Sequence, residues 1–184
     1  MTEERDERRL AALMARWQAG DPGAFDEVYA ATAGAVTGYL GRWFGSAAAP
    51  DLVQETYLRV VEARRTYRPD MPFRPWLFAI ARHVALDAHR RRKRHASREL
   101  VTDELPEVPV RASAEEHVNG GRLVESLRKL PAGQDELVWL AKVEGMTSTE
   151  IGRIVGASPG AVKVRLHRAL NRLKSLVDHE RSDR

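Results

Sequence analysis

The chain has 184 residues, with 30 Lys and Arg against 26 Asp and Glu, and it contains no cysteine. A hydrophobic content of 43% is enough for a core and excludes extensive disorder, and the length suits one domain or two small ones. The lack of cysteine excludes disulfides and cysteine-based zinc sites. No stretch approaches the roughly 18 apolar residues of a membrane span, and the charged start is unlike a signal peptide, so we expect no membrane insertion.

The first third of the chain predicts three helices. Asp21-Pro22 is typical of a helix start, with Asp as N-cap and Pro in the first turn. A break at residues 45–50 precedes a third helix, Asp51–Arg65, with an apolar stripe and an opposite polar face. The apolar positions of the three helices recur at helical spacing: Leu10, Leu13, Met14, Trp17; Phe25, Val28, Tyr29, Val36, Tyr39, Leu40, Trp43; Val53, Tyr57, Val60, Val61.

A loop and a long helix follow. Pro69 and Pro72 exclude a continuous helix across Thr66–Arg74, and Pro75 is placed in the first turn of the next helix. That helix carries an apolar stripe that ends in the basic run Arg90–Arg94. Beyond it, the sequence loses periodicity and gains acids and prolines, which indicates a linker. We therefore predict an all-α fold of two small helical domains, 8–95 and 114–179, joined by a flexible linker, 96–113.

The second domain ends in the most specific local pattern. Helices are expected near Ala114–Lys129 and from Pro131 to about Gly145. Next, Thr147 and Glu150 form a capping box, and Gly156 is placed to end this short helix in a left-handed conformation. Ser158 and Pro159 then predict the start of a longer helix whose buried stripe is Val162, Leu166, Ala169, Leu170 and Leu173. A short capped helix, a tight turn and a longer basic helix match a helix-turn-helix.

Basic and acidic residues gather in different segments of the sequence. Residues 82–98 carry seven basic residues and one acid, residues 99–116 carry six acids and one base, and residues 158–174 carry five basic residues and no acid. Two basic segments on either side of an acidic one predict two contact surfaces for an anionic polymer. The helix-turn-helix makes duplex DNA the expected polymer for the second domain.

Three stretches together resemble the extracytoplasmic-function (ECF) sigma factors of the sigma-70 family. They are DLVQETYLRV at Asp51–Val60, FRPWLFAIAR at Phe73–Arg82, and EGMTSTEIG at Glu144–Gly152 continuing through Arg168-Ala169-Leu170. The resemblance implies an alternative sigma factor that binds core RNA polymerase, recognises the minus-ten and minus-thirty-five promoter elements and opens DNA. It also implies a cytoplasmic protein that is not an enzyme, has no cofactor and is held by an anti-sigma factor.

The resemblance assigns three sets of residues. The face expected to bind the clamp helices of the polymerase beta-prime subunit is Asp51, Gln54, Glu55, Leu58 and Glu62; a further polymerase contact is expected at the beta flap. The minus-ten set is Tyr67, Met71, Phe73, His83, Asp87, Arg90, Arg91 and Arg94, in which the first three are expected to wall a pocket for a flipped base. The minus-thirty-five set is Ser158, Lys163, Arg165 and Arg168.

Several positions depart from the family. The family very often has Asn at His83, Thr at Ala161 and Ser at Val164, so the promoter preference is expected to differ. Arg is usual where Asp135 stands, so we expect no phosphate contact there. Asp87 is an anion and is expected to act through Arg90 or Arg91 rather than on DNA.

Alternatives remain for each assignment. The polar face of the third helix is also compatible with a solvated face that carries pairs such as Glu55–Arg59, and Tyr67 and Phe73 are compatible with rings that anchor the loop on the core. A stand-alone DNA-binding regulator would explain the second domain but not the stretches at 51–60 and 73–82. A nuclease would need a metal or catalytic constellation, and neither Asp51, Glu55 and Asp87 nor the scattered histidines have ligand spacing.

Overall fold

The computed structural model describes residues 2–45, 47–99, 126–127, 129–131 and 133–182. Every regular element in these ranges is helical, which confirms the all-α prediction. The chain divides into two compact units between residues 113 and 114, and each is described by itself. No helix of the described residues is long and apolar enough to cross a membrane.

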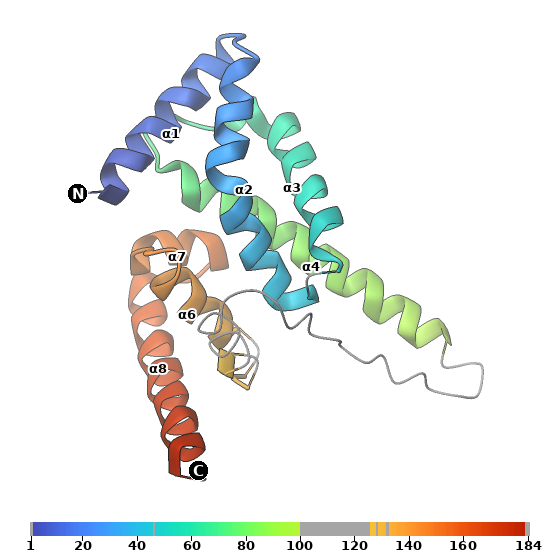
Figure 1. Cartoon of the computed structure of the whole chain (residues 1–184), viewed down its shortest axis with the longest axis vertical. Helices are drawn as coiled ribbons and strands as arrows, with labels where there is room; N and C mark the ends of the chain where they lie inside the picture. Colours follow the sequence, from blue (N-terminus) through green and yellow to red (C-terminus); the bar gives the residue numbers. More distant parts are fainter. Residues whose placement is uncertain (1, 46, 100–125, 128, 132, 183–184) are drawn as a thin grey trace. The chain divides into compact units, whose positions relative to one another are not determined.

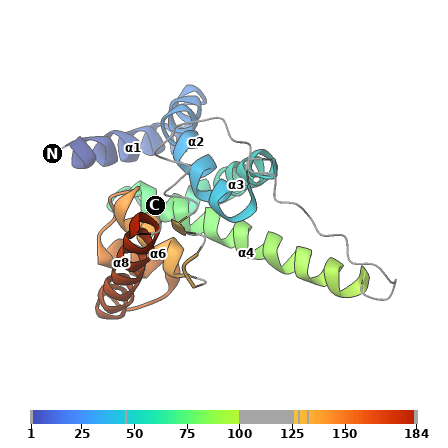
Figure 2. The ribbon, with the colours of Figure 1, turned by 60° about the horizontal axis from the view of Figure 1, so that its bottom comes forward.

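The N-terminal unit consists of α1 (Thr2–Gln18), α2 (Gly23–Phe44), α3 (Ala49–Ala63), the short 3-10 helix η1 (Arg64–Thr66) and α4 (Phe73–Glu99) (Figure 1). α2 packs against α1 on one side and α3 on the other, and α4 runs across them, as the second view shows (Figure 2). The predicted stripes meet in one core, whose fully buried side chains include Met14, Val28, Tyr39, Leu77 and Phe78. Burial of these apolar side chains drives the unit to fold.

Local chemistry sets the helix ends with small shifts from prediction. Pro22 rather than Asp21 is the N-cap of α2, although the Asp21 carboxylate still accepts a hydrogen bond from the Gly23 N–H at 3.0 Å. The third helix was predicted to end at Arg65 but ends at Ala63, and Arg64 and Arg65 belong to η1. Val61 was predicted to be on the apolar stripe but is 36% exposed, whereas its neighbour Val60 is fully buried.

α4 is longer than the sequence indicated. It begins at Phe73, two positions before Pro75, which the first turn tolerates because its missing N–H has no helical acceptor. The helix continues to Glu99, so residues 96–99, expected to be linker, are its last residues. The rest of the expected linker, 100–113, lies outside the described residues, as does most of the helix expected near Ala114–Lys129.

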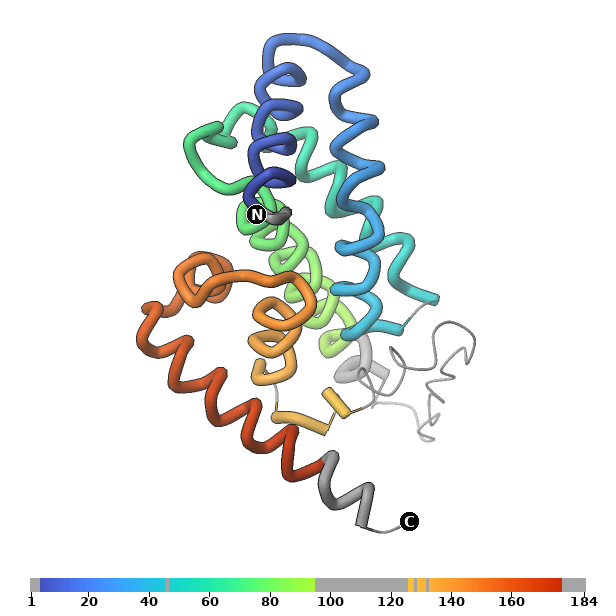
Figure 3. Tube along the Cα trace, turned by 60° about the vertical axis from the view of Figure 1, so that its left-hand side comes forward, coloured from blue at the N-terminus to red at the C-terminus, as the bar shows by residue number. Residues whose placement is uncertain are grey.

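The C-terminal unit contains α6 (Gln134–Lys142), α7 (Ser148–Val155) and α8 (Pro159–Ser182), which Figure 3 follows as one path from orange to red. The helix expected from Pro131 begins only at Gln134, because Gly133 takes a left-handed conformation, with φ 83°, and serves as N-cap. α8 packs against α6 and α7 through Val162 and Ala169, which are fully buried. Leu166, Leu170 and Leu173 are half-buried, so the predicted stripe is confirmed with a partly open edge.

Candidate nucleic-acid and polymerase interfaces

The helix-turn-helix forms from the capping residues that the sequence showed. The Thr147 Oγ1 accepts the Glu150 N–H at 3.3 Å, and the Glu150 carboxylate accepts the Thr147 N–H at 2.8 Å, which completes the capping box. Gly156 ends α7 with φ 69° and ψ 42°, a left-handed conformation that glycine adopts without strain. The Ser158 Oγ then accepts the Ala161 N–H at 3.2 Å and caps α8.

Gly152 lets α7 and α8 approach closely, a role that sequence analysis missed. A Cβ atom built at Gly152 would lie 2.5 Å from the carbonyl oxygen of Ala157, in the turn between the two helices. The Ala157 N–H in turn donates to the Gly152 carbonyl at 2.9 Å. A glycine inside a strongly amphipathic helix was the available signal, because it costs about 1 kcal/mol relative to alanine unless packing requires it.

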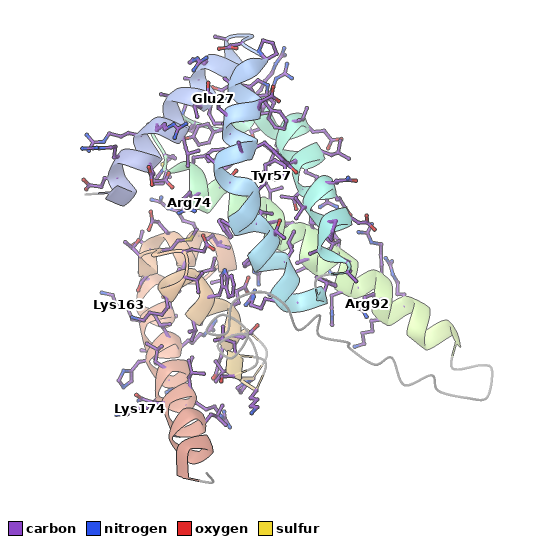
Figure 4. The ribbon with its side chains drawn as sticks, viewed as in Figure 1. Glu27, Tyr57, Arg74, Arg92, Lys163 and Lys174 are labelled. Carbon is purple, nitrogen blue, oxygen red and sulfur yellow. The ribbon has the colours of Figure 1, made fainter. Side chains whose placement is uncertain are left out.

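The predicted minus-thirty-five residues all lie on the open side of α8. Ser158, Lys163, Arg165 and Arg168 are exposed, and Figure 4 shows Lys163 and Lys174 projecting from this helix. Val164 is 52% exposed among them, so an apolar surface suited to a thymine methyl group lies beside the cations. α8 therefore presents several exposed basic side chains with an exposed valine among them, an arrangement that suits DNA.

The polar face of α3 is exposed as predicted, except at Glu55. Asp51, Gln54 and Glu62 are exposed, and Leu58 projects among them with 65% of its surface accessible. Tyr57, on the opposite side, is buried and its hydroxyl is hydrogen-bonded to Thr32 at 2.8 Å; burial raises the pKa of Tyr57 to about 12. An apolar anchor surrounded by acids and an amide suits a basic protein partner.

Glu55 belongs to an ion-pair network that joins α3 to α4. Its carboxylate contacts the guanidinium groups of Arg59 at 2.7 Å and Arg91 at 2.9 Å. Arg59 also donates to the Asp87 carboxylate at 3.0 Å, and this hydrogen bond holds the pKa of the Asp87 carboxyl below its ordinary value. Arg90 lies 3.7 Å from Asp87. The pair Glu55–Arg59, left open as an alternative, is therefore present, and Arg59 is a residue that sequence analysis did not assign to the site.

The network partly neutralises the basic run of α4. Asp87 pairs with Arg59 at 3.0 Å and lies 3.7 Å from Arg90, one of the two arginines through which it was expected to act. The guanidinium of Arg92 lies over the Phe44 ring, 5.9 Å from its centroid, so this side chain folds back on the unit (Figure 4). His83 and Arg94 are exposed on α4.

The loop before α4 holds its aromatic rings inward. Tyr67 is 3% exposed and Phe73 is fully buried, and their rings meet edge to face with centroids 5.5 Å apart. Trp76 packs against both. Of the three predicted pocket walls, only Met71 is half-exposed. The two rings therefore anchor the loop on the core, the alternative that the sequence left open, because their apolar area is better buried than solvated.

Metal chemistry finds no support in the side chains that the structure describes. No group of three His, Asp or Glu residues among them is close enough to hold a metal ion. The Arg59 guanidinium pairs with both the Glu55 and the Asp87 carboxylates. It therefore occupies the position between them that a metal cation would need.

Comparison with known proteins agrees with both units. Residues 28–95 match the family model Sigma-70 region 2, and residues 121–173 match Sigma-70, region 4. The chain is 36% identical over 170 residues to the RNA polymerase sigma factor CarQ of Myxococcus xanthus, covering 89% of this chain and 95% of CarQ. It is 36% identical over 183 residues to the ECF RNA polymerase sigma factor SigD of Mycobacterium tuberculosis, covering 92% of this chain and 84% of SigD.

A solved structure is also similar. CnrH, determined in complex with the cytosolic domain of CnrY, is 30% identical and superposes with a TM-score of 0.67, covering 94% of this chain and 97% of CnrH. The helix-turn-helix and the order of the two units agree with the family matches. The chain therefore belongs to the sigma-70 family and is an ECF RNA polymerase sigma factor, a transcription initiation factor rather than an enzyme.

Proposed function

We propose that the chain performs its sigma function through three separate surfaces. The face of α3 with Asp51, Gln54, Leu58 and Glu62 binds the clamp helices of the polymerase beta-prime subunit. The loop at Met71 and the outer side of α4 bind the minus-ten element, and the exposed side of α8 binds the minus-thirty-five element. The functional domains are 8–95 and 114–179, and the second also contacts the beta flap.

Leu58 carries the assignment of the polymerase face. A leucine that is 65% exposed, between acids and an amide, is poorly placed in an isolated chain. Interfaces commonly centre on such an apolar anchor, surrounded by a polar rim. Gln54 and Leu58 are better test positions than Glu55, because Glu55 also pairs with Arg59 and Arg91, so its removal would change the basic surface of α4 as well as the face of α3.

The test is co-migration of the chain with core RNA polymerase on a sizing column. Native chain should bind stoichiometrically, and Leu58→Ala or Gln54→Ala should weaken binding about fivefold or more, which corresponds to the loss of an interface contact of about 1 kcal/mol. Val164→Ala is the matched control, because Val164 is 52% exposed on the side of α8 that is proposed to face DNA, and no DNA is present in this assay. Undiminished binding by both α3 variants would move the interface elsewhere, and no binding by the native chain would contradict the function itself.

On the minus-ten side we propose phosphate contacts from Arg90, Arg91 and Arg94, with His83 toward the bases. Tyr67 and Phe73 support the loop from below, and Met71 lines the base pocket. Buried rings beneath a loop and exposed cations along the adjoining helix support this division of roles. On α8, Lys163, Arg165 and Arg168 hold phosphates, and Ser158 and Val164 lie nearest the bases.

We further propose that the chain acts in the cytoplasm and is inhibited by an anti-sigma factor. The first follows from its partners, because core RNA polymerase and chromosomal promoters are located there. The second is supported by the similar protein CnrH, which was solved with the cytosolic domain of CnrY bound. An inhibitor that covers the face of α3 would compete with polymerase for Leu58.

A further inference from the structure

Helix α1 holds the first end of the loop that precedes α4. The side-chain amide of Gln18, the last residue of α1, donates to the carbonyl oxygens of Arg64 at 2.7 Å and Tyr67 at 2.9 Å. Arg64 is the first residue of η1, and Tyr67 follows its last residue. One side chain thus fixes where the chain leaves η1.

The same helix holds the other end of the loop. The Glu7 carboxylate accepts the backbone N–H groups of Phe73 at 2.7 Å and Arg74 at 3.2 Å. These are the first N–H groups of α4, which usually receive a cap from the residue just before the helix. Pro72 occupies that place and has no capping side chain. The Glu7 carboxylate, 66 residues before Phe73, caps the helix instead.

The middle of the loop is held from within. The Tyr67 hydroxyl donates to the Met71 carbonyl at 2.7 Å, and the Met71 N–H donates to the Arg68 carbonyl at 3.0 Å. Burial, together with the nearby charges of Glu7 and Asp70, raises the pKa of Tyr67 to about 12, so the hydroxyl keeps its proton as a donor. The loop is therefore tied at both ends and across its centre.

We infer that Glu7 and Gln18 are positioning residues for minus-ten recognition, which hold the loop at residues 67–72 in its base-binding shape before DNA arrives. This rests on the proposed function of that loop. Extruding a base already costs a few kcal/mol of stacking, so a loop that also had to be ordered would bind more weakly. Neither side chain needs to touch DNA, and α1 lies outside the residues 28–95 that match Sigma-70 region 2.

The experiment uses the full chain assembled with core polymerase. A single-stranded oligonucleotide is first selected from a random pool by the native holoenzyme, and its affinity is compared with that of a scrambled strand. Glu7→Gln should lower the ratio of the two affinities about fivefold to thirtyfold, since glutamine offers one acceptor where two N–H groups need two. Binding of the scrambled strand and its salt dependence should not change, because no phosphate contact is lost.

Glu4→Gln is the matched control. It removes a carboxylate from α1 one turn earlier, where the one ion pair of Glu4 found among the described residues is with the exposed Arg8. Gln18→Leu is a second variant, which removes the bonds to Arg64 and Tyr67 without changing charge and is used if Glu7→Gln fails to fold. It should lower the same ratio.

The possible outcomes distinguish failure of the positioning role from failure of the proposed minus-ten function. A native affinity ratio in both variants overturns the positioning role. A parallel loss of polymerase binding, or of affinity for both strands, shows a general effect on the fold and also overturns it. If the native holoenzyme selects no strand at all, the proposed minus-ten function fails first, and the inference fails with it.

Discussion

Neutralising Glu55 should strengthen the binding of single-stranded DNA by the free chain. The Glu55 carboxylate holds Arg91 at 2.9 Å, and Arg91 is a proposed phosphate contact. Glu55→Gln removes the charge of the pair while keeping the size of the side chain. Arg59 retains Asp87 as a partner at 3.0 Å, so the junction between α3 and α4 is preserved.

The size of the effect follows from exposure. The Glu55 side chain is 29% exposed and that of Arg91 is 49% exposed, so solvent screens their attraction. Exposed pairs of this kind contribute about 0.2–1 kcal/mol, which corresponds to a gain in DNA affinity of about 1.4-fold to fivefold. One additional phosphate contact on a single strand should also steepen the dependence of log affinity on log salt by about 0.7.

Fluorescence anisotropy with a labelled single strand, at several salt concentrations and without polymerase, measures both quantities. Asp51→Asn is the control, because it changes the net charge equally on the same exposed helix, and no ion pair is found for Asp51 among the described residues. The double variant Glu55→Gln with Arg91→Ala should bind like Arg91→Ala alone.

Two results would refute this reasoning. If Glu55→Gln changes neither the affinity nor the salt slope, the pair with Arg91 does not restrain DNA binding. If the gain persists when Arg91 is absent, or if Asp51→Asn gives the same gain, the effect is one of total charge and the specific pair is irrelevant.

Two further predictions concern the helix junctions. Gly152→Val should destabilise the C-terminal unit by about 1–3 kcal/mol or more, because its side chain would overlap the Ala157 carbonyl, and thermal unfolding together with binding to duplex promoter DNA measures the loss. Asp87→Asn should lower the stability of the chain equally at pH 5 and pH 7 in urea unfolding. The bond from Arg59 lowers the pKa of Asp87 in the folded chain, so its contribution is complete above the unfolded value near 3.9 and is lost as the pH falls through the lower folded value. A stability gap that differs between pH 5 and pH 7 would contradict the assignment.

The sequence predicted the features that depend on neighbours in the chain. The capping box of Thr147 and Glu150, the left-handed Gly156 and the cap at Ser158 are all confirmed. Each depends on residues at most three or four positions apart, so the spacing of residue types is sufficient to reveal it. The periodic stripes of α1, α3 and α8 were visible for the same reason.

Contacts between distant segments could not be predicted this way. The bond from the Phe73 N–H to the Glu7 carboxylate joins α4 to α1, and the pairs Arg59–Asp87 and Arg91–Glu55 join α3 to α4. No period or spacing in the sequence marks them. The inward rings of Tyr67 and Phe73 depend on how the loop folds back on α1 and α4. The helix α6 starts at Gln134 rather than at Pro131, because Gly133 is its N-cap in a left-handed conformation that the spacing of residue types did not reveal.

The ion-pair network also bounds how strongly polymerase and DNA binding influence each other through this chain. If polymerase groups attract the Glu55 carboxylate, they weaken its pair with Arg91, and the arginine becomes available to phosphate. Linkage requires that DNA bound to Arg91 strengthens polymerase binding by the same factor. The factor cannot exceed the strength of the pair, about fivefold for side chains this exposed. A larger dependence of promoter binding on polymerase must therefore come from contacts made by polymerase itself, or from groups other than Glu55 and Arg91.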